Sequence, residues 1–293
     1  MKICSRLLIS AGALMLPLCV FAQQSFPQPE QAAEALVDAV SRHDDAALKQ
    51  LLGDDWQRYL PQKDVDPEEV ARFLRDWKVS HTMVKQGDVA HLNVGTESWQ
   101  LPIPIKQTAQ GWSFDMVAGA AEIATRTIGR NELSTLQAVA AYADAQHAFQ
   151  QSAGQYAQRF ISTDGQHDGL YWPVKEGEAP SPLGPAFGGE QPGSDYHGYY
   201  FRILTAQGAS ASGGAYSYID NGKMTKGFAL IAWPVSYGHT GITSFIINQQ
   251  GEVYQQDLGA DTDAVARATV AFDPDARWPV SYTHLTLPTT PYV

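Results

Sequence analysis

The chain has 293 residues, enough for one large domain or two ordinary ones, and 44% of them are hydrophobic while 17% are charged. Such a composition can bury a core, which excludes disorder as the dominant state. The formal net charge of −11 repels phosphate backbones, so we expect no nucleic-acid partner.

The first 22 residues are expected to be a signal peptide. Lys2 and Arg6 precede an apolar stretch over residues 7–21, and Val20-Phe21-Ala22 fits a cleavage site before Gln23. Removing this leader lowers the net charge from −11 to −13. We therefore expect a periplasmic or secreted protein.

Both cysteines, Cys4 and Cys19, lie in the expected leader. The mature chain then has no thiol for a disulfide, a nucleophile or a metal ligand. No later stretch is apolar for long enough to cross a bilayer, so we expect no transmembrane segment in the mature chain.

Residues 26–118 are expected to form an N-terminal α+β domain. Helical spacing of apolar residues follows Pro29, Asp44 and Pro67, and strand-like segments separated by turn residues come next. The expected strands cover 81–85, 89–94, 99–106 and 111–116. Two prolines should confine the third strand to a sheet edge. Helices before a curled antiparallel sheet resemble the nuclear-transport-factor-2-like and cystatin-like folds, in which helices cap a bent sheet.

Residues 119–280 are expected to form a second domain, a long helix packed on an antiparallel sheet. We expect a hinge-like stretch over 118–129, an amphipathic helix over 130–152 and a long loop over 164–194. Strands with glycine-containing corners should follow, with a hairpin at Asn221-Gly222 joining strands 215–219 and 224–232. Further strands are expected at 199–205, 243–248 and 252–256, with a last helix at 261–271.

The last stretch, 281–293, differs from the rest of the chain. It is rich in threonine and proline and has no hydrophobic period. We interpret it as a non-native tail and exclude it from the expected fold.

Six motifs together make the chain resemble a family of bacterial exported proteins, domain of unknown function 2950. The resemblance extends over the mature chain up to Trp278 and implies no activity. The motifs begin at Trp99 (WQLPIP), Gly111 (GWSFD), Ile128 (IGRNEL), Asp168 (DGLYWP), His197 (HGYYFR) and Gly227 (GFALIAWP).

The C-terminal half is also loosely similar to the head domains of pilins and pseudopilins. A helix containing Phe149 precedes Gly198-Tyr-Tyr-Phe and then Thr240-Gly241. This resemblance implies a long helix on a small antiparallel sheet. Pilins carry an apolar assembly helix directly after a short leader, whereas a different domain occupies that position here, so filament assembly does not follow.

The most polar candidate site is Asp164, His167 and Asp168 in the sequence DGQHDG. Carboxylates and an imidazole this close together could bind a divalent cation. The alternative is a glycine-rich turn in which the aspartates bind local backbone amides. The common catalytic motifs are absent from the sequence, and we expect no cofactor and no bound metal.

Aromatic and histidine side chains in the second half supply the other binding candidates. They are Tyr171, Trp172, His197, Tyr199, Tyr237 and His239. Exposed together, the aromatic rings would bind sugar rings or apolar peptide segments, and otherwise they fill the core. His239 lies in a tight corner and could act as an acid or base, or bind backbone.

We expect a non-enzymatic binding or envelope-associated protein. Its acting surface would be the 164–200 loop together with the nearby sheet corner, and its partner an envelope component or small ligand. The alternative is a hydrolase of cell-envelope material that uses Asp164, His167, Asp168 and His239. That alternative requires these side chains to meet in one concave site. At Arg130-Asn131-Glu132 the sequence allows either an anion clamp or a helix cap with an interdomain salt bridge.

Overall fold

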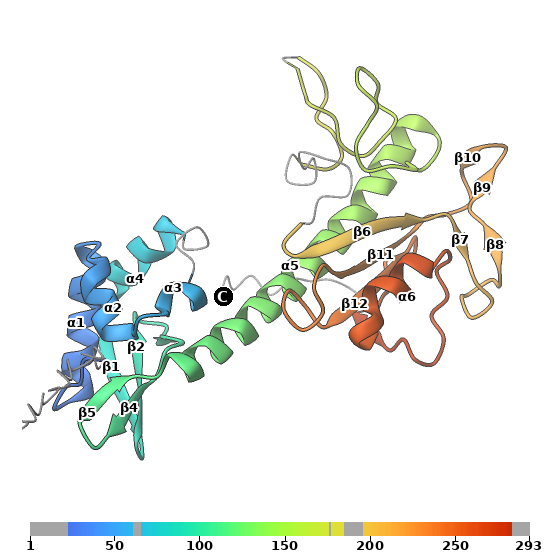
Figure 1. Cartoon of the computed structure of the whole chain (residues 1–293). Coiled ribbons are helices and arrows are strands. Elements are labelled where there is room, and N and C mark those ends of the chain that lie inside the picture. Colours follow the sequence, from blue (N-terminus) through green and yellow to red (C-terminus); the bar gives the residue numbers. More distant parts are fainter. Residues whose placement is uncertain (1–22, 61–65, 176, 185–195, 283–293) are drawn as a thin grey trace, which may run out of the picture. The chain divides into compact units, whose positions relative to one another are not determined.

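The computed structural model describes residues 23–60, 66–175, 177–184 and 196–282. The chain divides into two compact units, unit 1 ending at Glu122 and unit 2 beginning at Ile123. Helices and several antiparallel sheets confirm the expected α+β class (Figure 1). The expected signal peptide and residues 283–293 of the expected tail lie outside the described residues.

Unit 1 begins with helices whose first turns are fixed by local side chains. Asp44 accepts a hydrogen bond from the backbone N–H of Ala47, and Pro29 and Pro67 occupy first helical positions. The helices are α1 (Pro29–Ser41), α2 (Asp45–Leu52), α3 (Trp56–Tyr59) and α4 (Pro67–Val79).

The sheet of unit 1 has the order β1-β2-β4-β5, with β3 paired to β2. Alternate residues of β2 are buried, namely Ala90, Leu92 and Val94, which gives this strand one face toward the core. Helices α1 and α2 both contact β5. The strands are β1 (His81–Gln86), β2 (Val89–Val94), β3 (Trp99–Gln100), β4 (Ile105–Thr108) and β5 (Gly111–Phe114).

The expected strand over 99–106 is wrong. The segment forms two short strands, β3 and β4, because Pro102 and Pro104 between them have no N–H to donate. β4 is not at an edge either, since it pairs with both β2 and β5.

Helix α5 (Met116–Ala153) has 38 residues and replaces the hinge that we expected over 118–129. Asp115 caps its start by accepting a hydrogen bond from the N–H of Ala118 at 3.0 Å. Alanines at 118, 120, 121 and 124 favour the helix and outweigh the cost of Gly119 and Gly129. The division between the two units falls within this helix.

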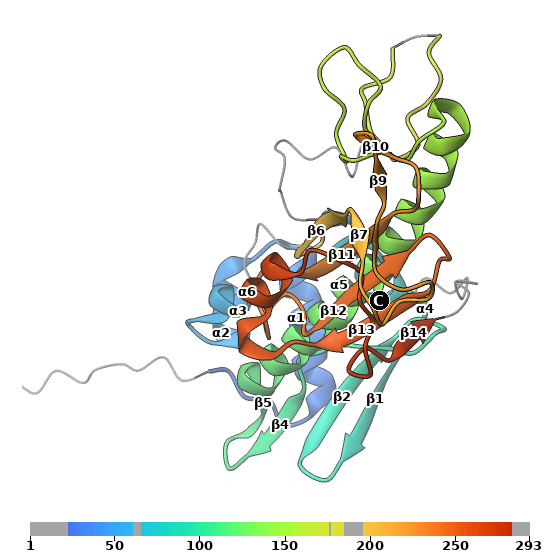
Figure 2. The same ribbon diagram turned by 90° about the vertical axis from the view of Figure 1, so that its right-hand side faces the viewer.

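The main sheet of unit 2 is antiparallel throughout, in the order β14-β13-β12-β11-β6. Figure 2 shows β12, β13 and β14 side by side. β14 includes Ser281 and Tyr282, the first two residues of the expected tail. The strands are β6 (Tyr199–Leu204), β11 (Ala229–Pro234), β12 (Thr243–Asn248), β13 (Val253–Asp257) and β14 (Val280–Tyr282).

Short strands link β6 to β11. The Asn221-Gly222 turn has φ of 50° and 79° and joins β9 to β10, which confirms the hairpin turn. The expected long strand over 224–232 is wrong, because the chain leaves extended pairing after Met224 and passes Gly227 before β11 begins. The short strands are β7 (Ala206–Gln207), β8 (Tyr216–Ser217), β9 (Ile219–Asp220) and β10 (Lys223–Met224).

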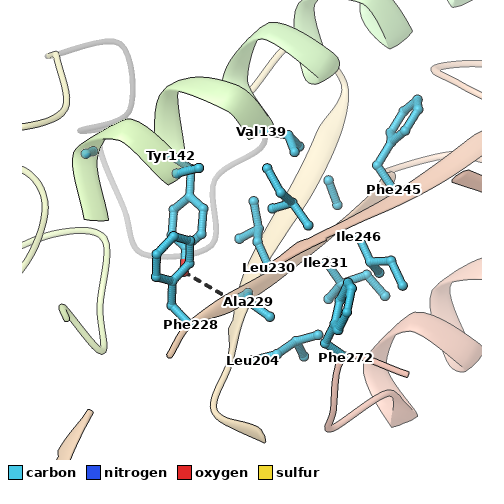
Figure 3. Packing of buried hydrophobic residues seen from close by; sticks show 14 of the residues in the cluster. Val139, Tyr142, Leu204, Phe228, Ala229, Leu230, Ile231, Phe245, Ile246 and Phe272 are labelled. Carbon is cyan, nitrogen blue, oxygen red and sulfur yellow. Dashed lines mark hydrogen bonds between the residues drawn. The ribbon is translucent and has the colours of Figure 1, made fainter. Parts of the chain in front are cut away.

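The core of unit 2 lies on both faces of β11, whose residues are all buried. Leu230 and Phe245 lie on the α5 side, where Val139 and Tyr142 cover the sheet (Figure 3). On the opposite side, Ile231 lies among residues that include Phe272 (Figure 3), and α6 (Thr262–Ala268), preceded by the 3-10 helix η3 (Gly259–Asp261), covers the strand. Burial of each large apolar side chain stabilises this core by about 1.5–3 kcal/mol.

Candidate functional site

The buried amide of Gln146 joins α5 to the segment that follows it. Its Nε2 donates to the carbonyl of Ala157 at 2.8 Å, and its Oε1 accepts from the N–H of Ala157 at 2.8 Å. Nε2 also donates to the hydroxyl of Tyr142, which in turn donates to the carbonyl of Ala229 on β11. The side chain therefore satisfies both backbone polar groups of Ala157, as a neighbouring strand would.

The middle of this segment is held to itself and to the core. The N–H of Ser162 donates to the carbonyl of Tyr171, and the N–H of Tyr171 donates to the carbonyl of Phe160, both at 2.8 Å. Leu170 is fully buried in the core cluster. Gly169 is required at its position, because a Cβ there would lie 2.8 Å from the carbonyl carbon of Ile161. The segment is therefore a loop that packs on the core, although it forms no helix or strand.

The exposed tip of this segment carries Asp164 and Asp168. The carboxylate of Asp168 accepts hydrogen bonds from the N–H and hydroxyl of Thr163 at 2.7 and 2.9 Å, and lies 3.4 Å from the guanidinium of Arg159. The backbone hydrogen bond, helped by the hydroxyl and Arg159, lowers the pKa of Asp168. Asp168 thus binds a local backbone amide, as in the glycine-rich turn that we gave as the alternative to a cation site. Asp164 and His167 are exposed.

The ring of His167 stacks on the indole of Trp172, with centroids 4.2 Å apart and planes 15° apart. Trp172 is only 9% exposed, so its ring offers no open face, and Tyr171 is half-buried. His167 is the exposed member of this pair. We name the exposed surface of Asp164, His167 and Asp168 the DHD tip.

The other candidates come from two places. Tyr237 and His239 lie in the connection between β11 and β12, residues 235–242, which we name the corner, and His197 and Tyr199 lie beside it at the start of β6. His197 and His239 are exposed, and the hydroxyl of Tyr237 donates to Asp257 at 3.2 Å, which raises the pKa of Tyr237. Tyr199 is fully buried and its hydroxyl donates to the carbonyl of Thr243 at 2.8 Å. Tyr199 is therefore a core residue and offers no ring face to a ligand.

Two polar residues of α5 hold this corner. Asn131 donates to the carbonyl of Thr240 at 2.9 Å, and the carboxylate of Glu132 accepts from the N–H groups of Ile242 and Thr243 at 3.0 and 2.9 Å. Glu132 is a backbone clamp within unit 2, a role that neither of our interpretations of this motif included.

The DHD tip and the corner are attached to α5 at positions far apart along the helix. The corner is held at Asn131, and the segment that carries the tip is fastened at Gln146. These positions are 15 residues apart, which corresponds to about 22 Å along a helix. Figure 1 shows residues 155–175 looping beyond the carboxyl end of α5. His239 is consequently not gathered with Asp164, His167 and Asp168.

No group of three or more histidine, cysteine, aspartate or glutamate side chains that could hold a metal ion occurs within the described ranges. Within the same ranges, none of the helices combines the length and the apolar character needed to span a membrane.

No pattern in the sequence indicated the polar cluster on the α6 face of the sheet. Arg202 donates to the carbonyls of Ala266, Arg267 and Thr269, so it satisfies the last turn of α6, and burial lowers its pKa. Asp263 accepts from the indole of Trp233 and from Arg267. An isolated arginine in a strand carries no pattern that identifies such a cap.

A small hollow of about 180 Å³ lies beneath α6, lined by Ile246, Val265 and Trp278 among others. Asp275 and Arg277 line it too, and they form an ion pair at 2.6 Å. The hollow is smaller than the usual volume of a small-molecule site, which begins at about 300 Å³.

The fold and these surfaces define an α+β protein of two units with a packed surface loop after a long helix. The chain belongs to the family described as protein of unknown function (DUF2950), whose family model matches residues 23–280. This confirms the resemblance inferred from the six motifs. No curated protein and no solved structure matches the chain.

Proposed function

We propose that the protein is exported and acts as a binding module of the cell envelope, using the DHD tip as its contact surface. The single observation that supports this best is the construction of segment 155–172. Buried anchors, Leu170 and the nearly buried Trp172, hold an exposed tip that carries His167 on a stacked ring. A fixed loop of this kind binds without a large ordering cost.

The binding function is favoured over hydrolysis by the placement of the candidate side chains. A hydrolase that uses Asp164, His167, Asp168 and His239 needs them within a few ångströms in one concave site. His239 belongs instead to the corner held by Asn131. Asp168 is also engaged by Thr163 and Arg159, and its pKa is lowered, which opposes a role as a general acid.

A thermal-shift screen of the chain from Gln23 to Val293 tests the proposal. The probes are divalent cations, oligosaccharides, peptidoglycan fragments and short apolar peptides. A ligand at 100 times its Kd stabilises the folded state by about 2.7 kcal/mol and so raises Tm. We expect at least one probe to raise Tm of the wild type, and the double variant Asp164→Ala/His167→Ala to lose that increase.

His81→Ala is the matched control variant. His81 is also exposed and stacks on a tryptophan, with its ring 3.8 Å from that of Trp77 in unit 1. It should keep the ligand-induced increase in Tm. The proposed function is contradicted if no probe raises Tm, or if the double variant and the control respond alike.

Export is tested separately by expressing the full chain in bacteria and measuring the mass of the protein in the periplasmic fraction. We expect the mass of a chain that begins at Gln23. A chain that retains residues 1–22, or that stays in the cytoplasm, contradicts the exported part of the proposal.

A further inference from the structure

Gln23 is the residue that the proposed cleavage turns into the N-terminus, and unit 1 holds its side chain. Its Nε2 donates to the carbonyl of Leu51 at 2.6 Å and to the carbonyl of Phe114 at 2.7 Å. Leu51 is in the last turn of α2, where carbonyls have no partner inside the helix. Both N–H bonds of the amide thus have fixed acceptors from distant parts of unit 1.

The backbone that follows Gln23 is fixed as well. The N–H of Gln24 donates to Gln50 at 2.8 Å, and Phe26 forms a two-way backbone pair with Trp112 at 2.8 and 2.7 Å. Gly111 allows this approach, because a Cβ there would lie 2.6 Å from the carbonyl oxygen of Phe26. The first residues of the mature chain are therefore part of unit 1.

A free N-terminal glutamine is chemically unstable. Its α-amine attacks Cδ of its own side chain, the new bond between that nitrogen and Cδ closes a lactam, and the bond between Cδ and Nε2 breaks. Nε2 leaves as ammonia with the proton that the amine gives up, so the reaction needs no other reactant. The leaving atom here is the atom that Leu51 and Phe114 hold.

We propose that unit 1 protects the mature N-terminus from pyroglutamate formation by binding Nε2 of Gln23. Cyclisation requires an opened state in which the amide has left both carbonyls and can fold back onto the amine. The product also lacks the donor, so it leaves both carbonyls without their partner. This inference rests on the proposed cleavage before Gln23.

The test measures the rate of ammonia loss by mass spectrometry of the N-terminal peptide. The samples are the folded chain that begins at Gln23, the same chain in urea, and a peptide of residues 23–32. Two hydrogen bonds that contribute about 1 kcal/mol each predict cyclisation roughly 30-fold slower in the folded chain.

A chain shortened by one residue is the matched control. It begins at Gln24, whose side chain is exposed. We expect it to cyclise several-fold faster than the folded chain that begins at Gln23. Equal rates in the folded and unfolded chains overturn the inference, and so does equal protection of the two folded chains, because the backbone would then be responsible.

The mass of the exported chain separates this inference from the proposed function. If that chain begins elsewhere, the proposed cleavage fails, while the rates measured on the recombinant chain still test the protection of Gln23. If the chain begins at Gln23 and is fully cyclised while folded, the protection fails and the proposed export stands.

Discussion

Single buried side chains account for the position of the candidate site, and Gln146 is the clearest of them. Its amide joins α5, the segment that follows and, through Tyr142, strand β11. Burial raises the pKa of the Tyr142 hydroxyl, so it stays protonated and can donate to Ala229. A buried network of this kind is stabilising only while every member keeps its partner.

Replacing Gln146 by leucine should destabilise the protein. The change introduces an apolar side chain of similar size and leaves the N–H and C=O of Ala157 without partners, which costs roughly 2–4 kcal/mol. Urea unfolding followed by fluorescence measures this loss as a lower midpoint. Gln150→Leu, at an exposed position of the same helix, is the control and should stay within about 0.5 kcal/mol of the wild type.

The lowered pKa of Asp168 predicts a dependence of stability on pH. A carboxyl group whose folded pKa lies below its unfolded value of about 3.9 stabilises the fold above that value, and the contribution is lost as pH falls through the folded pKa. Asp168→Asn should therefore be less stable than the wild type near neutral pH. The difference should shrink as the pH falls below the unfolded value.

Urea unfolding at a series of pH values checks this dependence. The effect should be small, because the Asp168 side chain is 36% exposed and its pairing with Arg159 is screened by solvent. A stability difference that grows as the solution becomes more acidic would contradict the account of this turn.

At the scale of elements, the sequence predicted best where one local pattern decides the structure. Helices α1, α2 and α4 follow apolar spacing with proline or aspartate at the start, and the β9–β10 hairpin follows from Asn221-Gly222. These patterns act within a few residues, so no distant part of the chain is needed to interpret them.

The predictions from the sequence were wrong or incomplete where the structure depends on residues far apart in the chain. The 118–129 stretch, where we expected a hinge, is helical because of its alanines. Tyr199 could not be assigned to the core rather than the surface, because its partner Thr243 is 44 residues away. The clamps made by Glu132, Gln146 and Arg202 likewise depend on tertiary contacts.

The two glycines of α5 should respond in opposite ways to replacement by alanine. A Cβ at Gly129 meets no atom within 4 Å, so Gly129→Ala should stabilise the protein by about 0.5–1 kcal/mol. A Cβ at Gly119 would lie 3.0 Å from Ile103, whose side chain is buried, so Gly119→Ala should give no gain or a loss. Thermal unfolding of both variants measures this contrast, and a destabilised Gly129→Ala would show that this part of α5 is not a regular helix.

At the scale of the whole molecule, the account depends on α5 belonging to the core of unit 2. Val139 and Tyr142 lie in one buried cluster with the central strands (Figure 3). Phe149 belongs to the same cluster. The corner and the DHD tip are both fastened to this helix, so their positions depend on its packing. Family membership supplies no activity, which makes this packing the basis for locating a site.

Amide hydrogen exchange of the chain from Gln23 to Val293 tests this dependence most directly. Buried amides in a cooperative core exchange only through large openings, whereas the amides of a solvated helix exchange through fraying. We predict that amides of residues 135–150 exchange as slowly as those of β11 and β12. Urea should accelerate exchange in these three segments together. Rapid exchange over residues 135–150, while β11 and β12 stay protected, would contradict the account.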